Sequence, residues 1–200
     1  MPCEAALGRA RFRRLDARDR AARRAHLARL DQEGARARFL GPPPRGSPPD
    51  PTLAAGCWID GRLRGVAELY ALPGRPGTAE LALTVERAFR GQGRGRLLLE
   101  RLLVLARNRG LRRLSTLCAE DNGRLIGLLR RLGAKITVEV GEARAELELL
   151  PATPATVALE RLEQWNTILT RLVALQRAWA ERCWPRAWSL AAAAPLTPWR

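Results

Sequence analysis

Lysine is nearly absent from this chain of 200 residues. Of its 35 basic residues one is a lysine, Lys135, so 35 − 1 = 34 are arginines, and the formal net charge is +15. Together with abundant Ala, Leu, Gly and Pro, this skew is typical of a high-GC genome. The arginines are spread along the whole chain, and aromatic residues make up only 5% of it, which leaves few rings for base stacking. We therefore interpret the charge as a solvated arginine-rich surface and keep a nucleic-acid-associated protein as a remote alternative.

Cysteine is also scarce, and its positions exclude several classes of protein. The four cysteines, Cys3, Cys57, Cys118 and Cys183, are scattered and form no C-x-x-C pair. We expect reduced thiols, no metal site and no disulfide framework. The chain lacks a run of about 18 apolar residues, and its first twenty residues lack the apolar segment of a secretory signal. These absences predict a cytoplasmic protein with no membrane contact.

Hydrophobic periodicity predicts an alternation of helices and strands. The predicted helices cover 15–33, 94–109 and 122–133, and the predicted strands lie within 53–72, 78–85, 111–119, 134–140 and 143–150. Asp60-Gly61 marks a two-residue hairpin, because both positions tolerate positive φ. The fold class is therefore α/β (α+β), a mixed sheet with helices on its faces, and we expect it to cover residues 8–150.

Residues 151–200 differ in composition, since five of the six tryptophans lie there. Leu162, Trp165, Leu169, Leu172 and Trp179 recur at steps of three and four residues, which predicts an amphipathic helix over 155–183 followed by a loose tail. Such an apolar stripe is expected to be buried. The helix either folds back on its own domain or pairs with the same helix in a homodimer.

A glycine-arginine turn, RGQGRG at 90–95, connects the strand at 78–85 to the helix at 94–109. A helix N-terminus presents unpaired N–H groups and a partial positive charge, and glycines let a ligand approach the backbone closely. The turn therefore predicts either an anion cradle or a plain strand-to-helix corner. No Gly-Lys-Ser/Thr follows it, and the preceding unit is not βαβ, so ATP and NAD sites are not favoured.

Two stretches of the chain resemble the GNAT superfamily of N-acetyltransferases. One is ELALTVERAFRGQGRGRLLLERLLVLARNRGLRRL, in which Arg90, Gly93 and Gly95 match the acetyl-CoA-binding turn of that family. The other is AEDNGRLIGLLRRLGAKI, in which Asn122 opens a helix that ends at Gly133. The resemblance implies a GNAT-like, mostly antiparallel twisted sheet and acetyl-CoA as cosubstrate. The cofactor-binding residues that it implies are Leu83, Thr84, Val85, Arg90, Gly91, Gln92, Gly93, Arg94, Gly95, Arg96 and Asn122. For Asn122, a plain helix N-cap is the alternative.

A catalytic base is expected on the strand at 78–85. Strand alternation places Glu80, Ala82 and Thr84 on one face. The other residues of this strand suit a buried position, so a carboxylate at Glu80 carries a free-energy cost that a function would explain. The resemblance implies that Glu80 accepts the proton of the attacking amine. The alternatives are that Glu80 faces solvent or pairs with an arginine, and Glu68 is the reserve candidate for the base.

Three positions depart from the family's pattern or fall outside it. Leu129 stands where many members carry a tyrosine that reprotonates the CoA thiolate, the only tyrosine is Tyr70, and Ala134 replaces the usual phenylalanine. The resemblance implies an N-acetyltransferase, and the departure at Leu129 leaves room for an inactive acyl-CoA-binding sensor.

A looser similarity to bacterial protein lysine acetyltransferases leaves the acceptor open between a small amine and a protein lysine or N-terminus. His26, in an arginine-rich stretch, is expected at the surface.

Overall fold

The computed structural model describes residues 10–40 and 49–183, and the chain divides into two compact units at 157/158. The strands are β1 (Arg11–Arg14), β2 (Leu53–Ile59), β3 (Arg62–Ala71), β4 (Thr78–Val85), β5 (Arg113–Ala119), β6 (Lys135–Glu139) and β7 (Glu142–Glu148). The helices are α1 (Arg20–Ala28), α2 (Gln32–Phe39), α3 (Arg94–Asn108), α4 (Gly123–Arg131) and α5 (Pro154–Cys183). None of the helices in the described ranges has the length and apolarity to cross a membrane.

The seven strands form one sheet in the order β1-β2-β3-β4-β5-β7-β6. Every neighbouring pair is antiparallel except β4 and β5. The hairpin between β2 and β3 turns at Asp60 and Gly61, whose φ angles of 49° and 73° are those expected of a two-residue turn. The predicted mixed sheet is confirmed.

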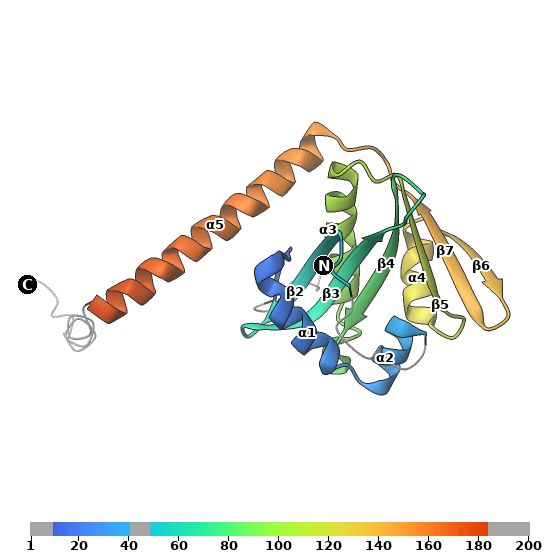
Figure 1. The fold of residues 1–200 in the computed structure, drawn as a ribbon, viewed down its shortest axis with the longest axis horizontal. Coiled ribbons are helices and arrows are strands. Elements are labelled where there is room, and N and C mark those ends of the chain that lie inside the picture. Colours follow the sequence, from blue (N-terminus) through green and yellow to red (C-terminus); the bar gives the residue numbers. More distant parts are fainter. Residues whose placement is uncertain (1–9, 41–48, 184–200) are drawn as a thin grey trace, which may run out of the picture. The chain divides into compact units, whose positions relative to one another are not determined.

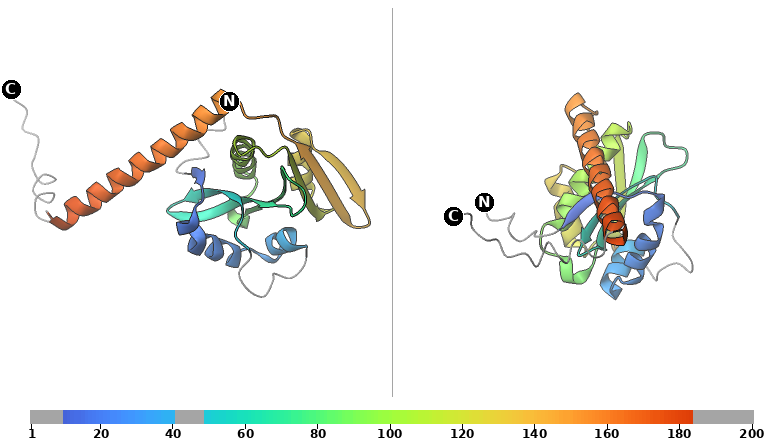
Figure 2. Two further views of the ribbon diagram at one scale, coloured as in Figure 1. Left: turned by 45° about the horizontal axis from the view of Figure 1, so that its top comes forward. Right: turned by 90° about the vertical axis from the view of Figure 1, so that its left-hand side faces the viewer.

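Helices cover both faces of the sheet (Figure 2), with α1 and α2 on one face and α3 and α4 on the other. The main core lies on the α3 and α4 side, where Leu98, Leu102 and Leu129 are at most 1% exposed. The α1 and α2 side is more polar, because the strand residues there include Glu68 and Thr84, which are also buried. The two faces therefore differ in chemistry: one is apolar and the other holds buried ion pairs.

The strands β4 and β5 pair only at their beginnings. The parallel register joins Thr78 to Arg113, Ala79 to Leu114 and Glu80 to Ser115, and no later residue of β4 pairs with β5. Figure 1 shows the two strands diverging beyond these paired ends. The sheet therefore opens in a V between its two central strands, with Glu80 at the vertex.

Two expectations about the N-terminal part of the domain were wrong. Within 15–33 the chain forms a 3-10 turn at Ala17–Asp19 and the helix α1, which ends at Ala28. The helix α2 begins only at Gln32, where Asp31 caps it by accepting a hydrogen bond from Gly34 N at 3.1 Å. The short strand β1 was not predicted at all. It lies on the edge of the sheet and is held by antiparallel pairing with β2, a contact over more than forty residues that local periodicity does not reveal.

The second unit contains α5 from Ala158 onwards, and the helix spans the predicted 155–183. Along it Leu162, Trp165, Leu169, Leu172 and Trp179 are each more than 50% exposed in the single chain. Burial of this stripe, in cis or in a homodimer, stays a prediction. The predicted tail beyond Cys183 lies outside the described residues.

Candidate active site

The turn before α3 exposes its backbone at the wide end of the V. Gly91 and Gly93 have φ angles of 76° and 75°, and a Cβ atom added at either would meet nothing within 4 Å. The first hydrogen bond of the helix runs from Leu97 N to Gly93 O, at 3.1 Å, so the preceding amides of the first turn have no partner within the helix. The turn thus combines open space at its glycines with N–H groups that have no partner within the helix, as an anion cradle requires.

The arginines of the turn do not all point at this cradle. Arg90 donates from Nε to Val85 O at 2.9 Å, and its Nη atoms bind Asp31 at 2.5 Å and Glu33 at 3.0 Å. Arg94 is 6% exposed and donates to Phe89 O, while Arg96 is exposed and donates to Glu100 on the same helix at 2.7 Å.

Gln92 supports the turn from within, since its Oε1 accepts a hydrogen bond from Arg94 and its Nε2 donates to Ala88 O at 3.5 Å. The positive potential at the cradle therefore comes from the backbone and the helix, with Arg96 as the exposed side chain closest in sequence to it.

The open edge of β4 leads from this turn to the vertex of the V. Glu86 N donates to Arg64 O on β3 at 2.9 Å, and antiparallel alternation then turns the main-chain groups of Leu83 and Val85 away from β3, toward the gap. Gly95 stands next to these residues, because a Cβ at Gly95 would lie 3.7 Å from Leu83. Leu83 and Val85 are therefore placed as expected for residues that pair with an extended ligand.

Thr84 is placed differently from its neighbours on β4. Its backbone N–H and C=O groups point toward β3. Its hydroxyl lies 2.9 Å from His26 Nε2 on the α1 side of the sheet. Thr84 is 6% exposed and serves the interior of that face. We therefore leave it out of the cofactor contacts that we propose below.

Asn122 caps α4 at the opposite arm of the V. Its Oδ1 accepts a hydrogen bond from Leu125 N at 3.3 Å, which is the helix-capping role named above as the alternative. The cap uses only the carbonyl oxygen of the side chain. The amide nitrogen retains its two donors, so capping and binding a ligand are compatible.

Glu80 lines a cavity of about 300 Å³ on the face that α1 and α2 cover in part. Its side chain is exposed, and among the described residues it forms no hydrogen bond or ion pair. Ser115 of β5 lies directly beside it in the parallel register, and Tyr70 of β3 lies opposite in the antiparallel register. Glu80 is therefore an accessible carboxylate at the point where the gap between β4 and β5 closes.

Glu68 has a different environment from Glu80, although both belong to the same sheet face. It is 1% exposed, it is bound by Arg23 Nε, and it accepts from Arg38 at 3.0 Å. Both arginines also donate to the Tyr70 hydroxyl, at 2.8 and 2.9 Å. Glu68 is thus enclosed by two guanidinium groups that join α1 and α2 to β3, and its carboxylate is not exposed at the surface.

His26 is buried, and its expected place at the surface was wrong. It is 0% exposed, with Nδ1 3.2 Å from Glu86 Oε1 and Nε2 2.9 Å from Thr84 Oγ1. Burial lowers the pKa of His26 below its usual value, against the opposing effect of Glu86. A neutral ring that donates from Nδ1 to Glu86 accepts at Nε2 from the Thr84 hydroxyl.

Leu129 lies in the main core and is 1% exposed. The position at which many GNAT proteins carry a tyrosine is therefore filled here by a buried aliphatic side chain. Tyr70, the only tyrosine of the sequence, stands on β3 with its hydroxyl bound by Arg23 and Arg38.

Comparison with known proteins agrees with this geometry. The family model described as the acetyltransferase (GNAT) family matches residues 12–134. Among solved structures, the GNAT domain of PAT from S. lividans is similar with 23% sequence identity and a TM-score of 0.62, over 70% of this chain and 90% of that one.

A putative acetyltransferase from Salmonella typhimurium, solved with its cofactor acetyl-CoA, is similar with 21% identity and a TM-score of 0.54, over 72% of this chain and 96% of that one. An N-acetyltransferase from Staphylococcus aureus Mu50 has 20% identity and a TM-score of 0.54, over 70% and 99%. At these identities the structures establish a shared fold. The family model covers more than half of the sequence, and the chain therefore belongs to the GNAT acetyltransferase family.

Proposed function

We propose that the chain is an N-acetyltransferase that moves the acetyl group of acetyl-CoA directly to an amine, with Glu80 as the general base. The observation that carries the proposal is the position of Glu80. Its free, exposed carboxylate lies at the vertex of the V, at the end of the open β4 edge that begins beside the anion cradle of α3. A base is needed at such a point because only a neutral amine attacks a thioester.

Acetyl-CoA, the cosubstrate of the family, fits the residues along this path. The backbone amides from about Gln92 to Arg96 suit a pyrophosphate, and the open space at Gly91 and Gly93 permits its close approach. The outward main-chain groups of Leu83 and Val85 suit the amides of an extended pantetheine arm, although the Val85 carbonyl already accepts from Arg90. The free amide nitrogen of Asn122 supplies a further donor from the other arm.

When bound, acetyl-CoA supplies an activated acetyl thioester. Glu80 accepts a proton from the ammonium group of the acceptor, directly or through one water, and the neutral nitrogen then attacks the acetyl carbon. A carbon–nitrogen bond forms, the nitrogen loses its second proton to solvent, the carbon–sulfur bond breaks, and CoA leaves as a thiolate. Because Leu129 has no proton to give, the thiolate takes its proton from solvent.

Replacement of Glu80 by Gln tests this assignment. E80Q should lower turnover by about 10²–10⁴-fold while the Kd for acetyl-CoA stays near that of the parent chain, and the loss should shrink at high pH, where more of the amine is already neutral. Asp60→Asn is the matched control, since it makes the same change at the distant β2–β3 turn, where Asn tolerates positive φ. Equal loss at every pH, or no loss, would remove Glu80 from the role of base.

An acyl-CoA sensor without catalysis is the second candidate, and the buried Leu129 favours it. The two candidates differ in a single measurement. Binding of acetyl-CoA by calorimetry, with no release of CoA in the presence of any small amine, lysine peptide or protein N-terminus, would identify a sensor. Release of CoA that depends on an amine identifies the enzyme.

A further inference from the structure

The cavity beside Glu80 has a distinctive set of charged side chains. It is lined by Leu72, Pro73, Arg75, Glu80, Ser115, Thr116, Leu117 and Arg144. The loop between β3 and β4 forms one wall, and β5 with β7 forms the other. Glu80 is the one carboxylate of this lining, and Arg75 and Arg144 are its two cations. A volume of about 300 Å³ lies at the small end of the range for ligand pockets, so it suits a molecule of amino-acid size or a single side chain.

Arg144 is placed by the sheet on the same side as Glu80. It lies opposite Leu117 in the antiparallel register of β5 and β7, and Leu117 shares a face with Ser115, the neighbour of Glu80. Arg75 is placed by its turn, where its backbone N donates to Leu72 O at 3.2 Å and its carbonyl accepts from Thr78 N at 3.1 Å. Arg75 and Arg144 thus line the cavity from opposite walls.

Neither arginine has a partner among the described residues, whereas three other arginines on this face of the sheet do. Arg23 and Arg38 bind Glu68, and Arg64 binds Glu86 at 2.8 Å. The other carboxylates along β7 are not part of the cavity lining, although Glu146 lies opposite Ser115 on the same sheet face. Glu148 is 3.5 Å from Arg113. Arg75 and Arg144 are both exposed, so their guanidinium groups are accessible to a ligand.

We propose that the acceptor is an amine that also carries a carboxylate, with its amino end at Glu80 and its carboxylate between Arg75 and Arg144. This inference rests on the proposed function and adds the class of substrate. Guanidinium groups bind carboxylates through paired, charge-assisted hydrogen bonds, and the acidic base favours the amino end of the same molecule. Two sources have this chemistry: a free amino acid and a lysine next to an acidic residue in a peptide.

Matched acceptors test the inference on the full chain with acetyl-CoA. One pair is γ-aminobutyrate and its amide; the other is a short blocked peptide with Lys-Asp and its counterpart with Lys-Asn. We expect kcat/KM to be about tenfold higher for the charged member of at least one pair, as is typical for a charge-assisted contact. The pair that shows the difference identifies the source, and preference for the neutral members would overturn the inference.

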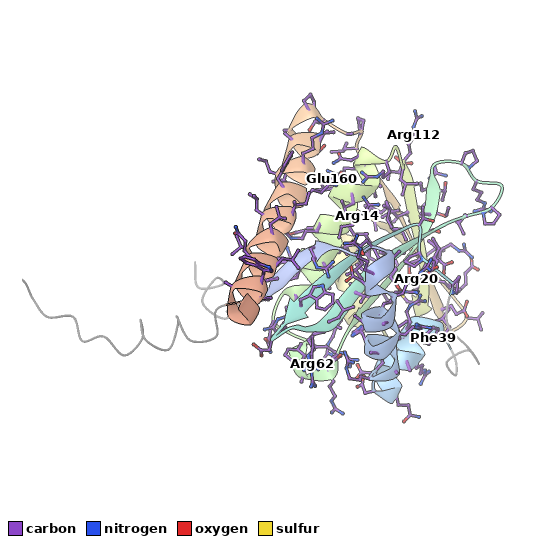
Figure 3. All side chains as sticks on the ribbon, turned by 60° about the vertical axis from the view of Figure 1, so that its left-hand side comes forward. Arg14, Arg20, Phe39, Arg62, Arg112 and Glu160 are labelled. Carbon is purple, nitrogen blue, oxygen red and sulfur yellow. The ribbon has the colours of Figure 1, made fainter. Side chains whose placement is uncertain are left out.

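Substitution of the two arginines supplies the second arm. R75Q and R144Q should each raise KM for the charged acceptor about tenfold, with kcat, the KM for the neutral acceptor and the Kd for acetyl-CoA unchanged. R62Q is the control, because it removes one positive charge at the far end of β3. Figure 3 shows that Arg62 lies well away from Arg112, which marks the opposite end of the sheet. A KM that R62Q raises as much as R144Q does would show a general charge effect and overturn the inference.

The failure of this inference is distinguishable from failure of the proposed function. Acetyl transfer to charged and neutral acceptors at equal rates, unaffected by R75Q and R144Q, overturns the inference and leaves the enzyme in place. If no acceptor is acetylated, calorimetry with γ-aminobutyrate and with the Lys-Asp peptide decides. Binding that R75Q and R144Q weaken supports the site, and the absence of such binding overturns it.

Discussion

Arg90 and Asp31 join the cofactor turn to the first turn of α2, with Arg90 Nη2 2.5 Å from Asp31 Oδ1. A Cβ atom at Gly34 would lie 2.6 Å from Arg90 Nη2, so a side chain there would displace the guanidinium group. Glu33 extends the contact across the V, since it binds Arg90 at 3.0 Å and lies 3.8 Å from Arg124 at the start of α4. The helix α2 therefore has charged contacts with both arms of the cleft, of which the one to Arg90 is the closer.

This contact predicts that the main role of Arg90 is to hold α2 in place, and not to bind the phosphates of the cofactor. Desolvation raises the pKa of Asp31, but the hydrogen bonds from Arg90 and Gly34 outweigh it and hold the pKa below its usual value. R90Q and D31N should each lower the free energy of unfolding, and the double variant should show a coupling of about 0.5–3 kcal/mol in urea denaturation, the range for residues in direct contact. Asn keeps the cap of α2, so D31N removes the charge alone. Additive losses would contradict a direct contact between the two.

Gly93 is the position at which a side chain should interfere most directly with cofactor binding. G93V places a branched side chain in the open space of the cradle and should weaken acetyl-CoA binding at least about a hundredfold, because the pyrophosphate needs close contact with the backbone. The backbone strain of Val at positive φ is a separate effect.

Gly110 offers the matched control, since it has a φ of 76° and equally open space at the other end of α3. G110V should therefore lose similar stability and keep full affinity in calorimetry. Normal affinity in G93V would remove the cradle from the cofactor site.

The sequence predicted the elements around the proposed cofactor site well, because the signals for these elements are local. β4 has alternation, α3 has leucine periodicity and α4 has an Asn cap within or beside their own residues. The observed bounds differ from the expected ones by at most two residues. The turn at Asp60-Gly61 was equally clear. These are the parts of the fold in which neighbouring residues decide the structure.

The polar face of the sheet was not predictable in the same way. Arg23 and His26 belong to an arginine-rich stretch that periodicity assigns to the surface, yet they are 5% and 0% exposed. Their burial depends on Glu68, which lies 45 residues after Arg23, and on Glu86, which lies 60 residues after His26. A carboxylate on a strand was recognised as a sign of function, but only the structure shows that Glu68 neutralises arginines and Glu80 remains free.

The thiols of the domain should be unreactive while it is folded. Desolvation raises the pKa of Cys57 to about 11, against a smaller opposing effect of Arg94, and burial likewise raises the pKa of Cys118. Iodoacetamide at pH 7.5 should therefore leave both residues unmodified in the native protein and label both in urea, because the thiolate is the reactive form. Peptide mass spectrometry resolves the individual sites. Labelling of native Cys57 at the rate of a free peptide thiol would contradict its burial.

His26 predicts how stability depends on pH. Its pKa is lowered in the folded protein, chiefly by burial, so between the usual value near 6.5 and the lower folded value the unfolded chain binds a proton that the folded chain does not. The free energy of unfolding should consequently fall as the pH drops below about 6.5, by at most about 1.4 kcal/mol per pH unit for one proton.

The surrounding charges do not reverse this sign between pH 7.5 and 5.5. Glu86 and Arg29 are 3.0 Å apart, and desolvation of Glu86 is outweighed by its hydrogen bonds with Arg64, Arg29 and His26, so its pKa is lowered and it stays ionised in this range. H26Q removes the titrating ring, and its slope should be flatter than that of the parent chain whatever its absolute stability. Urea unfolding of both proteins at pH 7.5, 6.5 and 5.5 measures the two slopes. If they are equal, the proton that destabilises the fold binds elsewhere and the buried imidazole is not its site.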